Sequence, residues 1–211
     1  MSLHLTRALV PYEIAARWHK DGGFSDSYAW HKRAWECFPG RRAADRDFLT
    51  RLDDTGSGFR LLILSACGPR KPDWCPDACW ETKQVAESFF GHKRYSFSLL
   101  ANPTVKKAAP RDGEGKRRGA RREPISRRED LVAWLERKGR QHGFRADTPT
   151  LRTVPRPRQG FVKNGKVGTL TATEFSGTLE VTDAPAFAQA FVSGVGSGKA
   201  FGFGMLCLAP L

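Results

Sequence analysis

The sequence GVGSGKAFGFGMLCLAPL occupies residues 194–211 and begins with five glycines in eleven residues. It follows a predicted helix that Asp183 caps and that extends to Phe191 or Val192. A dinucleotide-binding fingerprint instead follows a strand and opens a helix, so this stretch is not a Rossmann site. A Walker loop is also excluded, because Ala200 stands where that motif needs a hydroxyl to hold magnesium.

Two interpretations of this glycine-rich loop stay open. Its glycines allow backbone N–H groups to approach a phosphate closely, and Lys199 adds positive charge. The same composition also suits a tight connection from the helix to a closing strand at 205–208. The residues of the phosphate interpretation are Gly194, Gly196, Gly198, Lys199, Gly202 and Gly204.

Upstream of this loop, apolar runs separated by turn residues predict both strands and helices. Strands are expected at 3–10, 59–67, 80–85, 94–101 and 167–181, and helices from Asp26 or Ser27 to about Cys37 and from Ser126 to about His142. This order divides into two halves, residues 1–92 and 93–211, each with strands that can pack on helices. We therefore expect an α+β protein with two domains.

Composition narrows the class of partner. A chain of 211 residues with 40% hydrophobic residues can form a substantial core, which argues against wholesale disorder. Its 35 Lys and Arg against 22 Asp and Glu give a net charge of +13, which favours an anionic partner such as nucleic acid or an acidic membrane surface. The chain has no run of 18 apolar residues and no recognisable secretory signal, so we expect a cytoplasmic protein without a membrane segment.

The five cysteines are scattered, which favours reduced thiols. Cys67, Cys75 and Cys79 invite a zinc interpretation. Their spacing, however, lacks the paired C-x2-C of a structural zinc site, and His92 would be a distant fourth ligand. We expect neither a metal nor a cofactor.

The helix predicted after Asp26 carries the candidate catalytic residues. Tyr28 and His31 are three residues apart and share one helix face, so a phenol and an imidazole can reach one phosphate together. Histidine moves protons near neutral pH, which suits attack of a ribose 2′-OH on the adjacent phosphorus. Lys32 and Arg33 can support the transition state, although a solvated basic face explains them equally well. His19 is the second candidate histidine, and an ordinary surface role for His31 stays open.

The segment between Lys106 and Arg128 contains ten basic and three acidic residues. We expect a mobile loop here, followed by a basic helix. RNA stems are A-form, so a protein grips them mainly through shape and phosphates. Candidate RNA-binding residues are Lys106, Lys107, Lys116, Arg117, Arg118, Arg121, Arg122, Arg127 and Arg128, with a second cluster, Arg152, Arg156, Arg158 and Lys163, on a predicted hairpin. A run of cations can also serve solubility alone.

The glycine-rich loop and its continuation to Leu211 resemble the C-terminal signature of the CasE family. These proteins are CRISPR repeat-RNA endoribonucleases of type I-E Cascade, within the RAMP superfamily. Three further stretches match in the same order: YAWH at 28–31 with Trp35, FP at 38–39 and RDFL at 46–49; ANPT at 101–104 with Lys106; and FSGTL at 175–179 with DAP at 183–185. Together the four stretches extend over nearly the whole chain.

The resemblance implies two tandem ferredoxin-like (RRM-like) domains and metal-independent cleavage of CRISPR precursor RNA in each repeat. It also implies retention of the mature crRNA together with other Cascade subunits. It places the catalytic histidine at His31 and the assisting tyrosine at Tyr28. Two other functions stay open, a non-catalytic RNA-binding subunit of the same superfamily and a general basic RNA-binding protein without hairpin preference.

Overall fold

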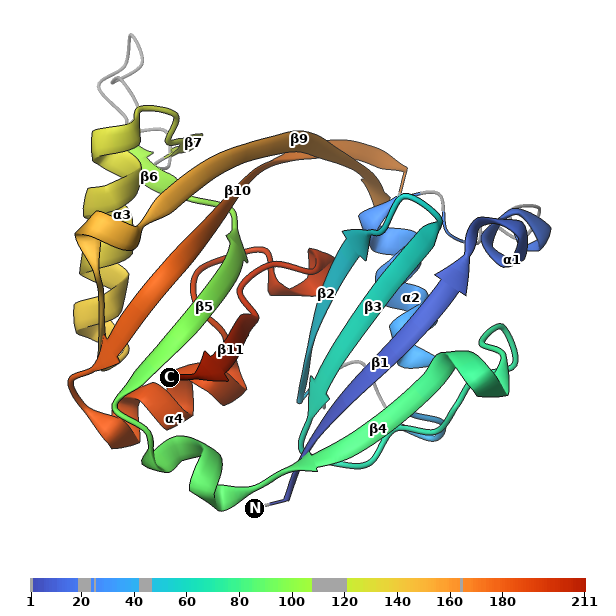
Figure 1. The fold of residues 1–211 in the computed structure, drawn as a ribbon. Helices are drawn as coiled ribbons and strands as arrows, with labels where there is room; N and C mark the ends of the chain where they lie inside the picture. The colour runs from blue at the N-terminus through green and yellow to red at the C-terminus, as the bar shows by residue number, and fades with distance from the viewer. Residues whose placement is uncertain (1, 19–23, 25, 42–46, 108–120, 164) are drawn as a thin grey trace, which may run out of the picture.

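The computed structural model describes residues 2–18, 24, 26–41, 47–107, 121–163 and 165–211. The strands form two larger antiparallel sheets and one short hairpin, and helices cover the larger sheets (Figure 1). The chain completes the first sheet before it enters the second. This arrangement confirms the predicted α+β class.

The first sheet has the strand order β2-β3-β1-β4. Its elements are β1 (Leu3–Pro11), α1 (Tyr12–Arg17), α2 (Ser27–Trp35), β2 (Phe48–Asp54), β3 (Gly58–Ser65), the 3-10 helix η3 (Asp77–Cys79) and β4 (Trp80–Val85). The continuous apolar run in β3 fits its central place, where β1 and β2 flank it on both sides. A second 3-10 helix, η4 (Glu87–Gly91), leads to the second sheet.

The second sheet has the order β11-β5-β10-β8, and β9 also pairs with β10. Its elements are β5 (Arg94–Ala101), α3 (Arg128–Gln141), β8 (Phe144–Ala146), η5 (Thr148–Thr150), β9 (Arg152–Lys163), β10 (Lys166–Val181), α4 (Ala184–Ser193), η6 (Lys199–Phe201) and β11 (Leu206–Pro210). The β9–β10 hairpin is long and arches from this sheet to α2 beside the first one (Figure 1).

The apolar core consists of two main clusters, one under each sheet. In the first sheet, Ile63 and Leu61 of β3 pack with Trp30 and Ala34 of α2. In the second, alternate residues of β5 pack with the buried faces of α3 and α4, which contribute large side chains such as Trp134 and Phe187. Leu49 and Leu64 of the first sheet belong to this second cluster. The two halves therefore share part of one core.

The structure confirms the predicted strands and adds elements that the sequence did not indicate. Helix α1 and strand β2 were not expected, because neither has a long apolar run. The predicted Ser126 cap is wrong: Arg127 occupies the N-cap position of α3 and gives no side-chain cap bond. The expected loop after Lys106 is partly a hairpin, because β6 (Thr104–Lys107) pairs with β7 (Arg121–Pro124).

Candidate RNA-cleavage site

Helix α2 is fixed at its N-terminus by an aspartate cap. Oδ1 of Asp26 accepts hydrogen bonds from the backbone N–H groups of Tyr28 and Ala29, at 2.9 and 2.8 Å. Such a cap contributes about 1 kcal/mol because it satisfies donors that have no partner inside the helix. The apolar face of the helix, with Trp30 and Ala34, is buried. His31 lies at the edge of this face and is half-buried.

The helix brings Tyr28 and His31 together as predicted. Their ring centroids are 6.2 Å apart with an interplanar angle of 30°. The imidazole also contacts Trp35, whose indole Nε1 donates a hydrogen bond to Nε2 of His31 at 3.1 Å. Trp35 in turn packs edge-on against Phe48 of β2, with centroids 4.9 Å apart. The imidazole is therefore held by aromatic neighbours from its own helix and from the adjacent sheet.

His31 lines a cavity of about 310 Å³ between the two halves of the molecule. The walls come from α2, β2, β3, the end of β5, β9 and the segment around η6; they are formed by Phe24, Asp26, Ser27, Trp30, His31, Thr50, Leu52, Phe59, Leu61, Leu100, Gln159, Gly160, Phe201 and Gly202. Most of this lining is apolar, and the polar side chains are few. A cavity of this kind can hold part of a nucleotide while His31 faces it.

The β9–β10 hairpin and the glycine-rich loop close the cavity from the second sheet. Backbone N–H of Val162 in β9 donates to Oδ2 of Asp26 at 3.2 Å. Phe161 packs on Phe201 with centroids 4.4 Å apart, and Phe201 lies 6.4 Å from the ring of Tyr28. The candidate catalytic helix is thus in direct contact with the hairpin that carries several candidate RNA-binding residues.

The two basic residues that follow His31 have different surroundings. Lys32 is exposed, and its Nζ lies 5.7 Å from the centroid of the Tyr28 ring. Arg33 forms an ion pair with Glu36 at 2.9 Å, and its guanidinium covers the rings of Trp18 and Phe24. Arg33 is therefore committed to packing on the helix, which does not support the transition-state role considered for it.

Two grooves with basic residues in their walls lie on the second half, and the first of them adjoins the cavity. The first, of about 500 Å³, shares Phe201 with the cavity and is also lined by Arg122 and Arg158. The second, of about 250 Å³, shares Arg122 and adds Lys106 and two residues of α3, Arg137 and Lys138. Arg137 and Lys138 were not among the residues predicted to bind RNA, although the basic character of α3 is visible in its sequence. We refer to the two grooves together as the basic track.

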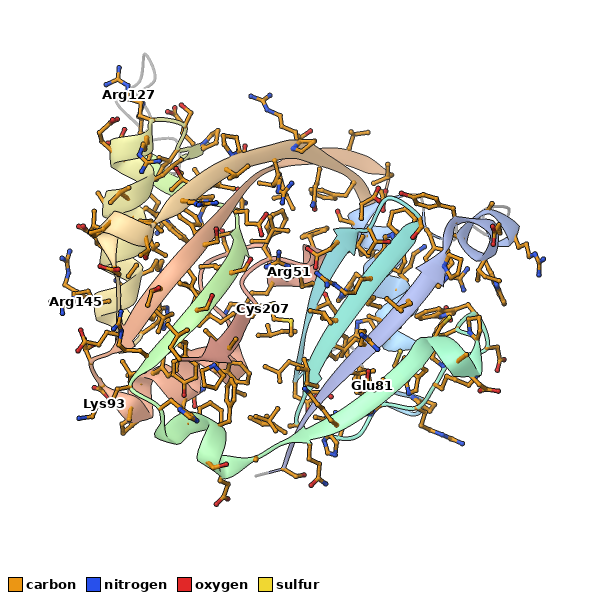
Figure 2. The ribbon with its side chains drawn as sticks, viewed as in Figure 1. Arg51, Glu81, Lys93, Arg127, Arg145 and Cys207 are labelled. Carbon is orange, nitrogen blue, oxygen red and sulfur yellow. The ribbon has the colours of Figure 1, made fainter. Side chains whose placement is uncertain are left out.

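The other candidate RNA-binding residues have varied surroundings. Lys107 pairs with Glu123 at 2.8 Å, Arg128 bonds weakly to Leu151 and Thr153, and Arg152 is exposed on β9. Arg127 lies at the end of α3, far from Arg51 between the sheets (Figure 2). Arg121 and Lys163 belong to β7 and β9, and their side chains are outside the described part of the structure, as are residues Lys116, Arg117 and Arg118.

Most glycines of the 194–204 loop serve packing. A Cβ on Gly194 or Gly196 would lie 3.0 to 3.2 Å from the side chains of Leu49 or Trp134, and one on Gly204 would lie 2.8 Å from a backbone oxygen. Backbone N–H of Gly204 donates to Leu100. The backbone N–H of Gly194 likewise donates to Ala190, so the N–H groups of Gly194 and Gly204 are both engaged within the fold. Gly196 lines the second groove beside Lys106 and Arg122, and its phosphate role stays a prediction. Gly198 and Gly202 flank η6, where Gly202 lines the cavity; Lys199 starts η6 and is not among the cavity residues.

A buried ion-pair network joins the two sheets and was not expected. Arg51 of β2 donates to Asp53 at 2.9 Å, to Ser98 of β5 at 2.7 Å and to Glu174 of β10 at 2.9 Å. Glu174 also accepts from Arg156 of β9 at 2.9 Å. Figure 2 shows Arg51 and Cys207 between the sheets. Arg156 is therefore already paired, which limits its role as a free phosphate contact.

Burial by itself raises the pKa of Glu174, but hydrogen bonds from Arg156, Ser98 and Arg51 outweigh this effect and lower its pKa to about 2. The carboxylate therefore stays ionised at all ordinary pH values. Its charge compensates Arg51, whose side chain is only 7% exposed.

The remaining sequence predictions concern His19, the cysteines, a metal site and a membrane segment. His19 lies outside the described residues. Cys75 is buried, and burial raises the pKa of its thiol to about 11, so it is protonated at neutral pH. Among the residues with described positions, no three His, Cys, Asp or Glu side chains gather as metal ligands. Within the same residues, no helix is long and apolar enough to cross a membrane.

Comparison with known proteins identifies the family. A family model described as "CRISPR associated protein" matches residues 3–210, which is almost the whole chain. The chain belongs to this CRISPR-associated family. The resemblance stated from four separate sequence stretches is thereby confirmed.

Two curated relatives and one solved structure show the similarity in detail. The chain is 32% identical to the CRISPR system Cascade subunit CasE of Escherichia coli over 94% of this chain and 96% of that protein. It is 36% identical to the CRISPR-associated endoribonuclease Cse3 of Thermus thermophilus over 56% of both chains. The crystal structure of Cas6e from Escherichia coli superposes with a TM-score of 0.75 at 26% identity, covering 99% of this chain and 100% of the other.

Proposed function

We propose that this chain is a metal-independent endoribonuclease that cleaves CRISPR precursor RNA at the 3′ base of each repeat hairpin. The observation that carries the proposal is His31 in the cavity between the sheets, beside Tyr28 and at one end of the basic track. Relatives described as a Cascade subunit and as a CRISPR-associated endoribonuclease support it. In this role the protein keeps its product and works with other Cascade subunits.

The reaction follows from what the site residues can do. The 2′-OH of the nucleotide at the cut loses its proton as its oxygen attacks the adjacent phosphorus, and the bond from phosphorus to the 5′ oxygen breaks. The products are a 2′,3′-cyclic phosphate and a 5′-OH, and no metal ion is needed. His31 moves one of the two protons. Tyr28 orients or donates to the phosphate, and Lys32 adds positive charge for the transition state.

We also propose that the two halves, divided near residue 92, are tandem ferredoxin-like domains. The strand orders support this. In each half the last strand lies at one edge of the sheet, and the first, third and second long strands follow it in that order: β4-β1-β3-β2 and β11-β5-β10-β9. The first half departs from the pattern between β3 and β4, where a proline-rich segment with η3 replaces a helix. The cavity that contains His31 lies between these two halves, and each half contributes part of its wall.

The test is cleavage of a labelled RNA containing the CRISPR repeat of the source genome, in EDTA. Wild type should cut once per repeat, and a single 2′-deoxy nucleotide at the cut should abolish the reaction. His31→Ala should lose cleavage while it still binds the RNA, and His92→Ala, at an exposed position, is the matched control. Cleavage by His31→Ala at the wild-type rate would refute the catalytic assignment.

Two further results would favour the other functions. If wild type binds the repeat tightly but never cuts it, the chain is a non-catalytic RNA-binding subunit. If unrelated stem-loops compete equally with the repeat, the chain is a general RNA-binding protein. A repeat-specific cut that depends on both the 2′-OH and His31 excludes both.

A further inference from the structure

Asp26 uses its two carboxylate oxygens for different purposes. Oδ1 caps helix α2 through the N–H groups of Tyr28 and Ala29, whereas Oδ2 accepts the N–H of Val162, which is 136 residues away in β9. One side chain therefore joins the start of the candidate catalytic helix to the far end of the β9–β10 hairpin. It also lines the cavity together with His31.

The hairpin that Asp26 contacts belongs to the surface proposed to hold RNA. Arg158 of β9 lines the basic track, and Gln159 and Gly160, which follow it, line the cavity. Arg158, an exposed cation on the track, is therefore only a few residues before Val162 on the same strand, and the backbone N–H of Val162 donates to Asp26. A shift of β9 along its length would move both the RNA contact and the attachment to α2.

The capping role alone does not explain an aspartate at this position. Serine and asparagine cap helices about as well as aspartate, and both are neutral. A carboxylate next to bound RNA repels phosphates and carries a cost in affinity. What a neutral cap lacks is a second acceptor oxygen, and the structure uses that oxygen on Val162.

We propose that Asp26 is a positioning residue that couples RNA held by the β9–β10 hairpin to the helix carrying His31 and Tyr28. This inference rests on the proposed function. The link fixes the distance between the hairpin backbone and the N-terminus of α2. RNA bound along the basic track is thereby presented to His31 in one register.

Asp26→Asn separates the two roles. Its single amide oxygen keeps the cap, and its NH₂ group faces the N–H of Val162, which needs an acceptor. We expect the single-turnover rate of repeat cleavage to fall about tenfold or more, because small misplacements of reacting groups are costly. Affinity for an uncleavable 2′-deoxy repeat should be unchanged or tighter, since a negative charge has been removed. Asp26→Ser also caps the helix but is too short to reach Val162, so we expect the same fall in cleavage rate without loss of affinity.

The matched control is Asp183→Asn. The Asp183 side chain caps α4 by accepting from the N–H of Ala186, and among the described residues it does not bond to a distant strand; the backbone N–H of Asp183 donates to Gly143, which Asp183→Asn leaves unchanged. This variant should cleave at the wild-type rate. Cleavage by both Asp26 variants at the wild-type rate would overturn the inference, and so would an equal loss of rate in the Asp183 control.

Amide hydrogen exchange tests the link without cleavage. In Asp26→Asn, exchange at Val162 should rise, while Tyr28 and Ala29 stay protected by the retained cap. Unchanged exchange at Val162 would overturn the inference. A wild type that binds RNA without cutting it would instead overturn the proposed function, and the exchange result would still decide whether Asp26 joins the hairpin to the helix.

Discussion

The indole of Trp35 donates a hydrogen bond to Nε2 of His31 at 3.1 Å. Indole nitrogen is a donor only, so the accepting Nε2 carries a lone pair and a neutral imidazole has its proton on Nδ1. Trp35 is one helical turn after His31, and its ring is held against Phe48 of the neighbouring sheet. The tautomer of the candidate catalytic histidine is therefore set by a tertiary contact as well as by its own helix.

We expect Trp35→Phe to reduce repeat cleavage about tenfold, because it keeps the aromatic packing but frees the imidazole to turn. Trp80→Phe, on β4 of the first sheet, is the matched control, and single-turnover cleavage of the repeat measures the difference. An unchanged rate for Trp35→Phe would show that the indole serves only packing.

Replacing the carboxylate between the sheets should destabilise the protein. Glu174→Gln leaves the buried guanidinium of Arg51 with less compensation, and we expect a loss of about 2 kcal/mol or more in the free energy of unfolding. Glu180→Gln is the control on the same strand, because Glu180 pairs with Arg145 at an exposed position. Urea denaturation of both variants measures the difference, and equal losses would contradict the special role of Glu174.

The same carboxylate gives stability a defined pH dependence. The pKa of Glu174 is about 2 in the folded protein against an ordinary value of 4.5, so the unfolded chain binds more protons between these values. Its contribution is complete above about pH 4.5 and is lost as the pH falls towards 2. Stability curves of wild type and Glu174→Gln should therefore converge over this acid range, and parallel curves would refute the assignment.

Gly204 should be intolerant of a side chain. Its φ is +90°, and an added Cβ would lie 2.8 Å from the carbonyl oxygen of Val195. We expect Gly204→Ala to cost about 1–3 kcal/mol of stability. Gly56 has a similar φ of +82° with nothing within 4 Å, so Gly56→Ala separates backbone strain from the clash. Thermal unfolding should show the larger loss for Gly204→Ala; equal losses would mean that the close contact is harmless.

The basic track should contribute mainly electrostatic affinity for RNA. Each of Arg122→Ala and Arg158→Ala is expected to lower the slope of log Kd against log salt concentration by about 1. Arg145→Ala, outside the track and paired with Glu180, is the control. Binding of the uncleavable repeat across a salt series measures the slopes. If the two track variants keep the wild-type slope, RNA does not follow this groove.

Much of the site was visible in the sequence because it depends on local spacing. A cap at Asp26 or Ser27, of which the structure uses Asp26, and the shared face of Tyr28 and His31 follow from helical geometry within a short stretch of chain. The central strand β3 is a continuous apolar run, and α4 begins at its predicted cap, Asp183. Local signals of this kind do not depend on where the rest of the chain lies.

Other features exist only because distant segments meet. No pattern in the sequence pairs Arg51 with Glu174, Oδ2 of Asp26 with Val162, or the cavity wall of α2 with Phe201. The glycine-rich loop shows the same division: composition allowed either a phosphate site or tight packing, and only the fold showed that the N–H groups of Gly194 and Gly204 are used in backbone hydrogen bonds. The sequence by itself determined the apolar strands, the capped starts of α2 and α4 and the shared helix face of Tyr28 and His31, because these follow from short-range sterics and periodicity. Only the tertiary structure decided which groups from the two halves meet, because long-range contacts arise from how whole sheets pack.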